Sequence, residues 1–363
     1  MNELHAPHTH PIGELTIWRH RIRAAEHAIL PNYTARPNPL VAGELVIASI
    51  FSPGIVCAVD RTTGNHRWNG RTGGFAGSTV TFANGTLYAK SSHTVYALDA
   101  TSGQVKWTFC PYGTGHEWIY STPTVHRKMI FVGDRAGKFH CLDTGSGETV
   151  WWKQMNRSRN SDVNATARIH KQSVIVATNA GLAVAYHAAT GRQLWRTRLD
   201  GPCGWELSIF ESKVVVPTHR SLYLLDTEDG KVVERWNWGR SVVKAFAVTP
   251  RAIVVITETE ASWRSVKPDN VDEAATIRGV RPGNVVFEHR TSKYAWGIRW
   301  DRKTGFLYES RIDGFGILNA TTGERIHNIT AKRGELFPGL ADVKDNVIYL
   351  LSMSGSLYAL NHP

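Results

Sequence analysis

The chain has little of what marks several common protein classes. Its 363 residues include only four cysteines, Cys57, Cys110, Cys141 and Cys203, and they form no Cys-x-x-Cys pair. A disulfide-stapled scaffold and a thiolate zinc site are therefore not expected. No stretch is long and apolar enough to cross a membrane, and apolar residues show no helical period.

The N-terminal residues MNELHAPHTHPIGELT contain no apolar run and no small-residue cleavage site. They do not read as a signal peptide, and no cysteine for lipid attachment follows them. We therefore expect a cytoplasmic protein that does not associate with membranes. Residues 1–14 are predicted to form a disordered leader, and residues 15–363 a single domain.

The net charge of +11 favours acidic partners, but Lys and Arg are spread along the whole chain without a basic run. Specific nucleic-acid binding is therefore not expected. The sixteen histidines include no HExxH pattern, and the carboxylates do not cluster. The sequence consequently predicts no metal site.

What the chain does contain is a short motif written six times. The clear copies are AVDRTTGNHRW (Ala58–Trp68), ALDATSGQVKW (Ala97–Trp107), CLDTGSGETVW (Cys141–Trp151) and AYHAATGRQLW (Ala185–Trp195). Weaker copies are LLDTEDGKVVERW (Leu224–Trp236) and ILNATTGERIH (Ile317–His327). The recurring positions are Asp60, Gly64, Trp68, Asp99, Gly103, Trp107, Asp143, Gly147, Trp151, Gly191, Trp195, Asp226, Gly230 and Gly323.

Each copy has the chemistry of a β-hairpin. The Asp carboxylate can accept hydrogen bonds from the turn, and Gly supplies the positive φ that a short turn needs. The flanking residues read as two strands, and Trp can fill the gap between neighbouring sheets. His187 and His327 stand where other copies have Asp and Trp. We interpret them as structural variants.

Two further strand candidates precede each hairpin, which gives four strands in a repeat of about 40 residues. This pattern favours an all-β, single β-propeller. Complete copies cover 39–76, 77–120, 121–164, 165–206, 207–245 and 297–335, and a degenerate sixth blade covers 246–296 with a polar insertion at 267–282. Strand 15–22, with Trp18 in the inter-blade position, would pair with 339–361 and close eight blades. Seven blades are the alternative if the degenerate copy merges with its neighbour.

These repeats resemble those of the pyrroloquinoline-quinone (PQQ) dehydrogenases and of the propeller lipoprotein in the outer-membrane β-barrel assembly machine. The resemblance implies the propeller fold over nearly the whole chain. The dehydrogenases are longer, exported and carry adjacent cysteines against the cofactor. This sequence has no Cys-Cys pair and no recognisable calcium-ligand set. We therefore expect no PQQ redox chemistry and no cofactor.

Candidate functional residues lie where loops of a propeller meet at one rim. These are the connections from a fourth strand to the next blade and those between second and third strands. As acid–base groups, should the protein be an enzyme, we single out His116, Glu117, Glu206 and Glu335. As ligand-binding groups we single out Trp118, Tyr120, Arg135, Trp205, His219, Arg220, Lys244, Tyr294, Trp296 and Arg311.

Two functions fit this rim. The first is a monomeric binding propeller whose charged, aromatic-rich rim pocket holds a small-molecule ligand or a protein partner. The second is a cofactor-independent lyase, cyclase or isomerase that uses the acid–base residues of the same pocket. The sequence leaves open which of the two applies, and it identifies neither the ligand nor the reaction.

Overall fold

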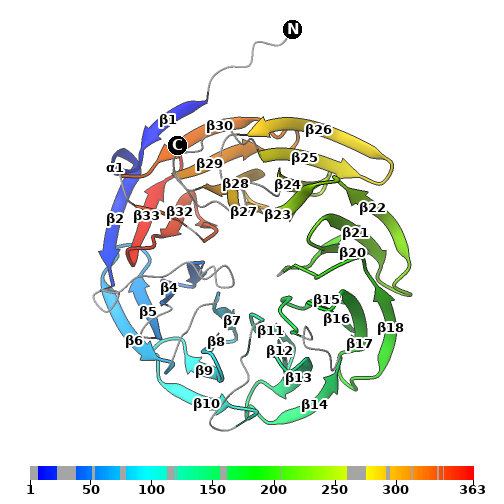
Figure 1. Cartoon of the computed structure of the whole chain (residues 1–363). Coiled ribbons are helices and arrows are strands. Elements are labelled where there is room, and N and C mark those ends of the chain that lie inside the picture. The colour runs from blue at the N-terminus through cyan, green and yellow to red at the C-terminus, as the bar shows by residue number, and fades with distance from the viewer. Residues whose placement is uncertain are drawn as a thin grey trace.

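The computed structural model describes residues 7–22, 38–50, 54–73, 79–112, 119, 121–155, 162–204, 206–259, 275–291, 295–311, 314–332, 335–337 and 339–363. Within these ranges the strands form eight sheets. Figure 1 shows the sheets as blades around a central axis, in the order of the chain. The predicted eight-bladed β-propeller is confirmed.

The first four blades follow one another without interruption. Blade 1 has β3 (Leu40–Ala42), β4 (Leu45–Ile50), β5 (Ile55–Asp60) and β6 (His66–Arg71). Blade 2 has β7 (Thr81–Ala83), β8 (Thr86–Lys90), β9 (Val95–Asp99) and β10 (Val105–Phe109). Blade 3 has β11 (Thr124–His126), β12 (Met129–Gly133), β13 (Lys138–Asp143) and β14 (Thr149–Gln154). Blade 4 has β15 (Arg168–His170), β16 (Ser173–Thr178), β17 (Leu182–His187) and β18 (Gln193–Arg198).

The last four blades include the elements from the N-terminal part of the chain. Blade 5 has β19 (Ser208–Phe210), β20 (Lys213–Pro217), β21 (Ser221–Asp226) and β22 (Val232–Asn237). Blade 6 has β23 (Ser241–Val248), β24 (Ile253–Thr259), β25 (Ala275–Arg281) and β26 (Asn284–Thr291). Blade 7 has β27 (Ala295–Trp300), β28 (Phe306–Arg311), β29 (Gly314–Asn319), β30 (Arg325–Thr330) and the added β1 (His8–Pro11). Blade 8 has β31 (Asp342–Lys344), β32 (Val347–Leu351), β33 (Ser356–Asn361) and β2 (Thr16–Arg21), and helix α1 (Ile12–Leu15) joins β1 to β2.

Burial along each blade follows from its position between two neighbours. In blade 4, the middle strands β16 and β17 are buried at almost every residue, because each face packs on another blade. The outer strand β18 alternates, with Trp195 buried between exposed residues. The core is thus a series of layers between blades, such as the layer of Ile47 and Ala58 against Leu87 and Leu98.

The hairpin motif folds as its composition predicts. In blade 1, Asp60 Oδ1 accepts the backbone N–H groups of Thr62 and Thr63 at 3.0 and 2.8 Å. Gly64 has a φ of +71°, and its N–H donates to the Asp60 carbonyl at 2.9 Å. The strand register then shifts by one residue between Ala58 and Val59, so a β-bulge follows the turn.

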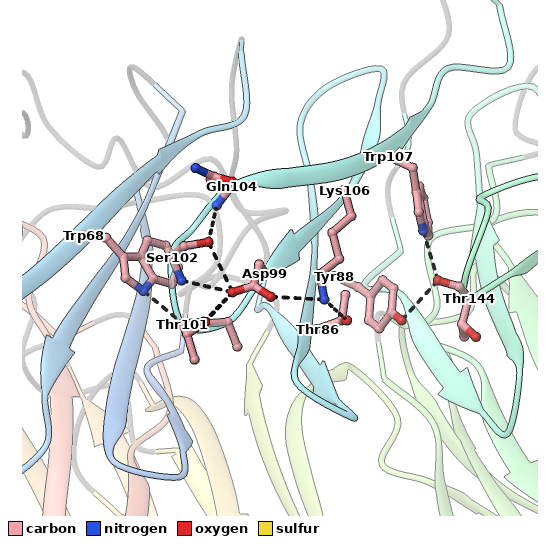
Figure 2. A network of polar contacts seen from close by, with 11 residues as sticks. Trp68, Thr86, Tyr88, Asp99, Thr101, Ser102, Gln104, Lys106, Trp107 and Thr144 are labelled. Carbon is pink, nitrogen blue, oxygen red and sulfur yellow. Dashed lines mark hydrogen bonds and ion pairs between the residues drawn. The ribbon is translucent and has the colours of Figure 1, made fainter.

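The motif tryptophan joins each blade to the next. Trp68 Nε1 donates to the Ala100 carbonyl at 3.1 Å, and its ring covers Gly103, where an added Cβ would lie 2.3 Å from Trp68 Cε3. Figure 2 shows the hydrogen bond of the Trp68 indole and that of the next junction, in which Trp107 Nε1 donates to the Thr144 carbonyl at 2.9 Å. A glycine is required at this position because any side chain would overlap the indole. We call this pairing of indole and turn the tryptophan junction.

The ring closes through the predicted strand. Strand β2 pairs antiparallel with β33, from Thr16 opposite Leu360 to Arg21 opposite Ser356. Trp18 forms a tryptophan junction with blade 1, since its Nε1 donates to the Arg61 carbonyl at 3.0 Å and its ring covers Gly64. Closure thus covers the edge of β33 that would otherwise be exposed on the outside of blade 8.

The prediction of a disordered leader at residues 1–14 is wrong for residues 8–14. Strand β1 runs parallel to β30, with His8 opposite His327 and Pro11 opposite Thr330. Helix α1 follows, and Ile12 is buried in the core between blades 7 and 8. The order comes from pairing with the edge of β30 and burial of one isoleucine, neither of which leaves an apolar pattern in the sequence. Residues 1–6 lie outside the described residues.

Blade 6 differs from its predicted outline of 246–296. It comprises β23 to β26, which span residues 241–291 in the described part of the chain. Residues 275–281, which we assigned to the polar insertion 267–282, form its third strand, whereas residues 267–274 lie outside the described residues. A turn with Gly283 at a φ of +71° follows, so this blade has a hairpin although it lacks the motif Asp.

Among the described residues, no helix has the length and apolar character needed to cross a membrane.

Candidate functional site

The predicted rim is where β-strands two and three of each blade connect and where each fourth strand leads to the next blade. Antiparallel pairing brings these connections to one end of the sheets. Of the predicted site residues, His116, Glu117, Trp118, Tyr120, Trp205 and Tyr294 lie outside the described residues. Trp296 belongs to β27, but its side chain is not described.

Glu335 is a buried carboxylate at the junction of blades 7 and 8. Its exposed fraction is 9%, and the Tyr358 hydroxyl donates to Oε1 at 2.5 Å. Arg19 from β2 lies 3.5 Å from the same oxygen and stacks over the Tyr358 ring at 5.2 Å. Burial, and then the hydrogen bond to Glu335, raise the pKa of Tyr358. Glu335 therefore links β33 and β2 within blade 8.

Glu206 lies between blades 4 and 5 and is exposed. Its backbone forms a parallel bridge with Thr166, which brings it near Arg168. Burial lowers the pKa of Arg168, and the Glu206 carboxylate opposes this change. Glu206 and Glu335 therefore interact with different partners, on different sides of the ring.

Lys244 and Arg311 belong to buried charged groups in blades 6 and 7. Lys244 Nζ lies 3.3 Å from Glu258 Oε2, and the Glu258 side chain is only 3% exposed. The Arg311 side chain is 5% exposed and lies 4.0 Å from Glu309, while its Nη2 donates to Asn328 at 3.1 Å.

Glu309 is the centre of the blade 7 group. Its side chain is fully buried, and Arg325 Nη2 donates to its Oε2 at 2.5 Å. Two arginines therefore face one carboxylate inside the blade. Because this site is buried, removing either the carboxylate or the arginines would leave the opposite charge uncompensated.

The remaining predicted cationic groups occupy connections between second and third strands. Arg135 in blade 3 and Arg220 in blade 5 are exposed, and His219 is half-buried. The His219 carbonyl accepts the Val243 N–H at 3.0 Å, which ties this connection to blade 6.

Sequence reasoning missed a buried lysine, Lys90, at the end of β8. It is 8% exposed, and its ammonium donates to the Ile119 carbonyl at 2.8 Å. Burial lowers its pKa to about 8. The available signal was a lysine that ends the otherwise apolar strand TLYAK.

A second group, of which the rim loops predicted Tyr112 and Asp134 but not His140, is a buried Tyr–Asp–His network in blade 3. Asp134 is fully buried and accepts the Tyr112 hydroxyl at 2.7 Å and the Lys138 N–H at 2.8 Å. His140 Nε2 lies 2.9 Å from the same carboxylate. The sequence signal for the network was two polar residues: Asp134 directly after β12, and His140 within the apolar strand β13. The network fixes the connection between these strands.

The structure also has a groove at the opposite rim, where no site was predicted. It encloses about 450 Å³ and lies between the turns of blades 7 and 8. Its lining is Asp301, Lys303, Thr304, Phe306, His327, Val343, Asp345, Asn346, His362 and Pro363. The replacement of the motif Trp by His327 was the sequence signal for an altered junction. Within the described residues no group of three or more His, Cys, Asp or Glu side chains is placed to hold a metal ion.

Comparison with solved structures identifies the fold. BamB from Moraxella catarrhalis superposes with a TM-score of 0.67 and 15% identity, covering 95% of this chain and 97% of that one. A europium-containing methanol dehydrogenase gives 0.68 and 13%, covering 92% and 84%. The quinohemoprotein alcohol dehydrogenase from Comamonas testosteroni gives 0.66 and 12%, covering 95% and 76%. No curated protein matches the sequence.

The family model described as outer membrane protein assembly factor BamB matches residues 14–111, 93–178 and 152–265. These overlapping matches extend over more than half of the 363 residues. Together with the eight blades and their repeated tryptophan junctions, they show that the chain belongs to the PQQ-like repeat family of BamB-type β-propellers.

Proposed function

We propose that this chain is a binding propeller that holds a protein partner or a small-molecule ligand at the predicted rim, without PQQ redox chemistry. The observation that carries the proposal is the pairing of the buried rim charges within separate blades. Lys244 faces Glu258, Arg311 lies 4.0 Å from Glu309, and Tyr358 donates to Glu335. Groups fixed in this way keep their positions and present a constant pattern of charge, which suits recognition.

General acid–base catalysis has different structural requirements from recognition. Its groups must exchange protons and meet around one reacting atom. Glu206 and Glu335, the two described members of the predicted acid–base set, have separate partners at different blade junctions. The described rim is therefore better suited to contact a partner at several points than to act on one small substrate.

The described residues do not fit PQQ. The four cysteines are reduced and lie far apart in the sequence, so no adjacent pair can lie against the cofactor. The rim carboxylates Glu258 and Glu309 already face cations, and Glu335 accepts from Tyr358. The donor set that a calcium ion needs would have to be taken from these pairs.

Site-specific photo-crosslinking in cells tests the proposal. A photoreactive phenylalanine would replace the exposed Arg135 or Arg220 at the rim, and the exposed Val105 or Val285, at the opposite ends of outer strands, as controls. We expect adducts of defined mass from the rim positions and none from the controls. Absence of rim adducts, with a folded protein by circular dichroism, would contradict rim binding.

The enzymatic alternative, a cofactor-independent lyase, cyclase or isomerase, is favoured by one observation. Burial lowers the pKa of Lys90 to about 8, so this amine loses its proton close to neutral pH. A neutral lysine can act as a base or nucleophile. Titration of the ¹³C-methylated protein by NMR would test this role. A Lys90 resonance that titrates near pH 10 would remove the basis for it.

A further inference from the structure

The outer strand of blade 4 carries a row of exposed cations. Arg192 directly precedes β18, and Leu194, Arg196 and Arg198 follow at every second position. All four are exposed, whereas Trp195 between them is buried. Because side chains alternate along a strand, Leu194, Arg196 and Arg198 share one face, whereas Arg192 lies in the turn before the β-bulge and adds its charge at that end. We call them the β18 row.

The turn of blade 4 also differs in charge from the turns of other blades. In blades 1 and 2 the motif Asp pairs with a cation of the fourth strand, as Asp60 does with Arg67 at 2.7 Å and Asp99 with Lys106 at 3.2 Å. In blade 4 the same position is His187, which contacts Gln172 at 3.3 Å. The turn of blade 4 therefore lacks the motif carboxylate, and Leu194 stands where Arg67 and Lys106 stand in blades 1 and 2.

The arginines of the row are also without salt bridges elsewhere. Within the described ranges, Arg192, Arg196 and Arg198 form no ion pair. Lys153 of blade 3 adds to the positive charge, since its Cε lies 3.0 Å from where a Cβ of Gly191 would be. By contrast, the equivalent face of β22 is neutralised, with Lys231 on Asp229 at 2.6 Å and Arg235 on Asp200 at 2.6 Å.

The backbone edge of β18 is open as well. The order of its sheet is β15-β16-β17-β18, so β18 pairs on one side only within the described residues. The ring itself shows what such an edge can accept. In blade 7, β1 lies along the outer strand β30 as a fifth strand, from His8 opposite His327 to Pro11 opposite Thr330. An outer strand of this propeller is therefore geometrically able to take another strand.

We propose that β18 binds an acidic, extended segment of a partner protein as a fifth strand of blade 4. Main-chain hydrogen bonds would pair the segment with the open edge. Carboxylates at alternate positions would face Arg196 and Arg198, an apolar residue would face Leu194, and Arg192 would add positive charge at the turn. This surface is on the outer strand and is independent of the rim in the proposed function.

An acidic protein segment fits these features better than a nucleic acid. The cations alternate with one apolar side chain along a strand edge that still needs hydrogen-bond partners. A phosphate backbone would neutralise the arginines but leave the edge and Leu194 unused. Nucleic-acid binding is therefore an outcome that the test must be able to show.

Fluorescence anisotropy of a labelled peptide tests the proposal. The probe has about twelve residues, enough for one β-strand, with glutamate alternating with valine and leucine. We expect Arg196→Glu/Arg198→Glu to weaken binding by about tenfold or more, because two attractions become repulsions. The control, Arg71→Glu/Arg290→Glu, makes the same charge change on β6 and β26 and should leave binding unchanged.

Two further probes separate strand addition from simple charge attraction. A peptide of equal charge in which prolines replace the apolar residues cannot pair along the edge, so it should bind much more weakly. Amide hydrogen exchange in β18 should slow with the first peptide only. Equal binding of both peptides, equal effects of the two double variants, or tighter binding of an oligonucleotide of similar length would each overturn the proposal.

Discussion

The blade junctions of this ring fall into two groups. From blade 8 through blade 5, each junction uses the same indole contact, with Nε1 of Trp18, Trp68, Trp107, Trp151 and Trp195 donating to a turn carbonyl of the next blade. From blade 5 through blade 8, the equivalent positions hold Glu234, Phe287 and His327. The ring is nevertheless continuous through both groups, as Figure 1 shows.

At the three junctions without tryptophan, no single described residue provides both the ring contact and the hydrogen bond of the indole. Glu234 accepts the Gly283 N–H of the next turn at 3.0 Å, which is a hydrogen bond of opposite direction. Phe287 covers Gly323 as an indole would, and His289 contacts the Thr322 carbonyl at 2.6 Å. In these two junctions the contacts are still made to the turn of the next blade, although the residues that make them differ. An aromatic face and a hydrogen bond can come from different residues.

The junction of blades 7 and 8 departs furthest. His327 has no motif turn beneath it, and β1 lies beside it instead, with His10 Nε2 3.2 Å from His327 Nδ1. The groove described above opens at the same place. Here the comparison shows that closure by an N-terminal strand removes the motif turn from one blade, and that a histidine contact takes its place.

The largest difference between the two groups should appear on truncation of a junction residue. Trp151→Ala removes a side chain that is 9% exposed and its bond to Ala188, and should lower the free energy of unfolding by about 3 to 5 kcal/mol. Glu234→Ala should cost only about 1 kcal/mol, since it removes one hydrogen bond between the blades, from the Gly283 N–H, and one local bond from the Arg235 N–H. Urea titrations followed by circular dichroism measure both. Equal costs would mean that the two kinds of junction are energetically alike.

A smaller difference is expected at the turn glycines. Gly103→Ala places a Cβ against the Trp68 ring at a φ of +72°, so both overlap and backbone strain should destabilise by about 3 kcal/mol. Gly283→Ala has a similar φ of +71° but meets nothing within 4 Å, so strain alone, about 1 kcal/mol, should remain. Thermal unfolding of the two variants separates the cost of overlap from the cost of backbone strain. A costlier Gly283→Ala would contradict the indole argument.

Lys90 tests whether the tryptophan-joined blades tolerate a buried charge. Its pKa falls from 10.5 to about 8 on folding, so the unfolded chain binds more protons between these values and stability should rise with pH across that window. Below pH 8 the charge costs about 3 kcal/mol. Lys90→Met loses a hydrogen bond but should gain about 2 kcal/mol at pH 7 and lose the dependence. Unchanged pH dependence would exclude Lys90 as its source.

The smallest expected effect is a loss of stability at acid pH that arises from His327 at the junction of blades 7 and 8. Burial, then the charges of His10, His8 and His362, lower the pKa of His327. The unfolded chain therefore takes up this proton more readily, and stability should fall as pH drops through the ordinary histidine range near about 6.5. His327→Gln should reduce that fall, whereas His187→Gln in the turn of blade 4 should not. Unfolding at pH 7.5 and 5.5 compares them.

The motif predicted the blades, the closing strand and Trp18 because each rests on local chemistry that repeats in the sequence. Strand β25 escaped prediction because its polar residues are satisfied by neighbours in the folded blade: Arg278 pairs with Glu288 at 2.8 Å and contacts Thr257. Strand β1 escaped because its order depends on the distant β30.

The site was less predictable than the fold. The rim was defined by loop position, yet a loop position does not say whether a charge is exposed. Arg311 and Glu309 form a buried pair, and Lys90 ends a strand that reads as apolar. Such groups depend on contacts between distant segments, which a single sequence does not display.

The closure of blade 8 also imposes an order on folding. Arg19 and Ser356 meet across 337 positions of sequence, so strand β2 leaves the ribosome long before the strand that completes its sheet. Until then its edges and Trp18 have only blade 1 to pack on, which exposes a site for mispairing between nascent chains. Moving β2 to follow β33 by circular permutation would turn this long-range pairing into a hairpin, and should speed the final step of ring formation.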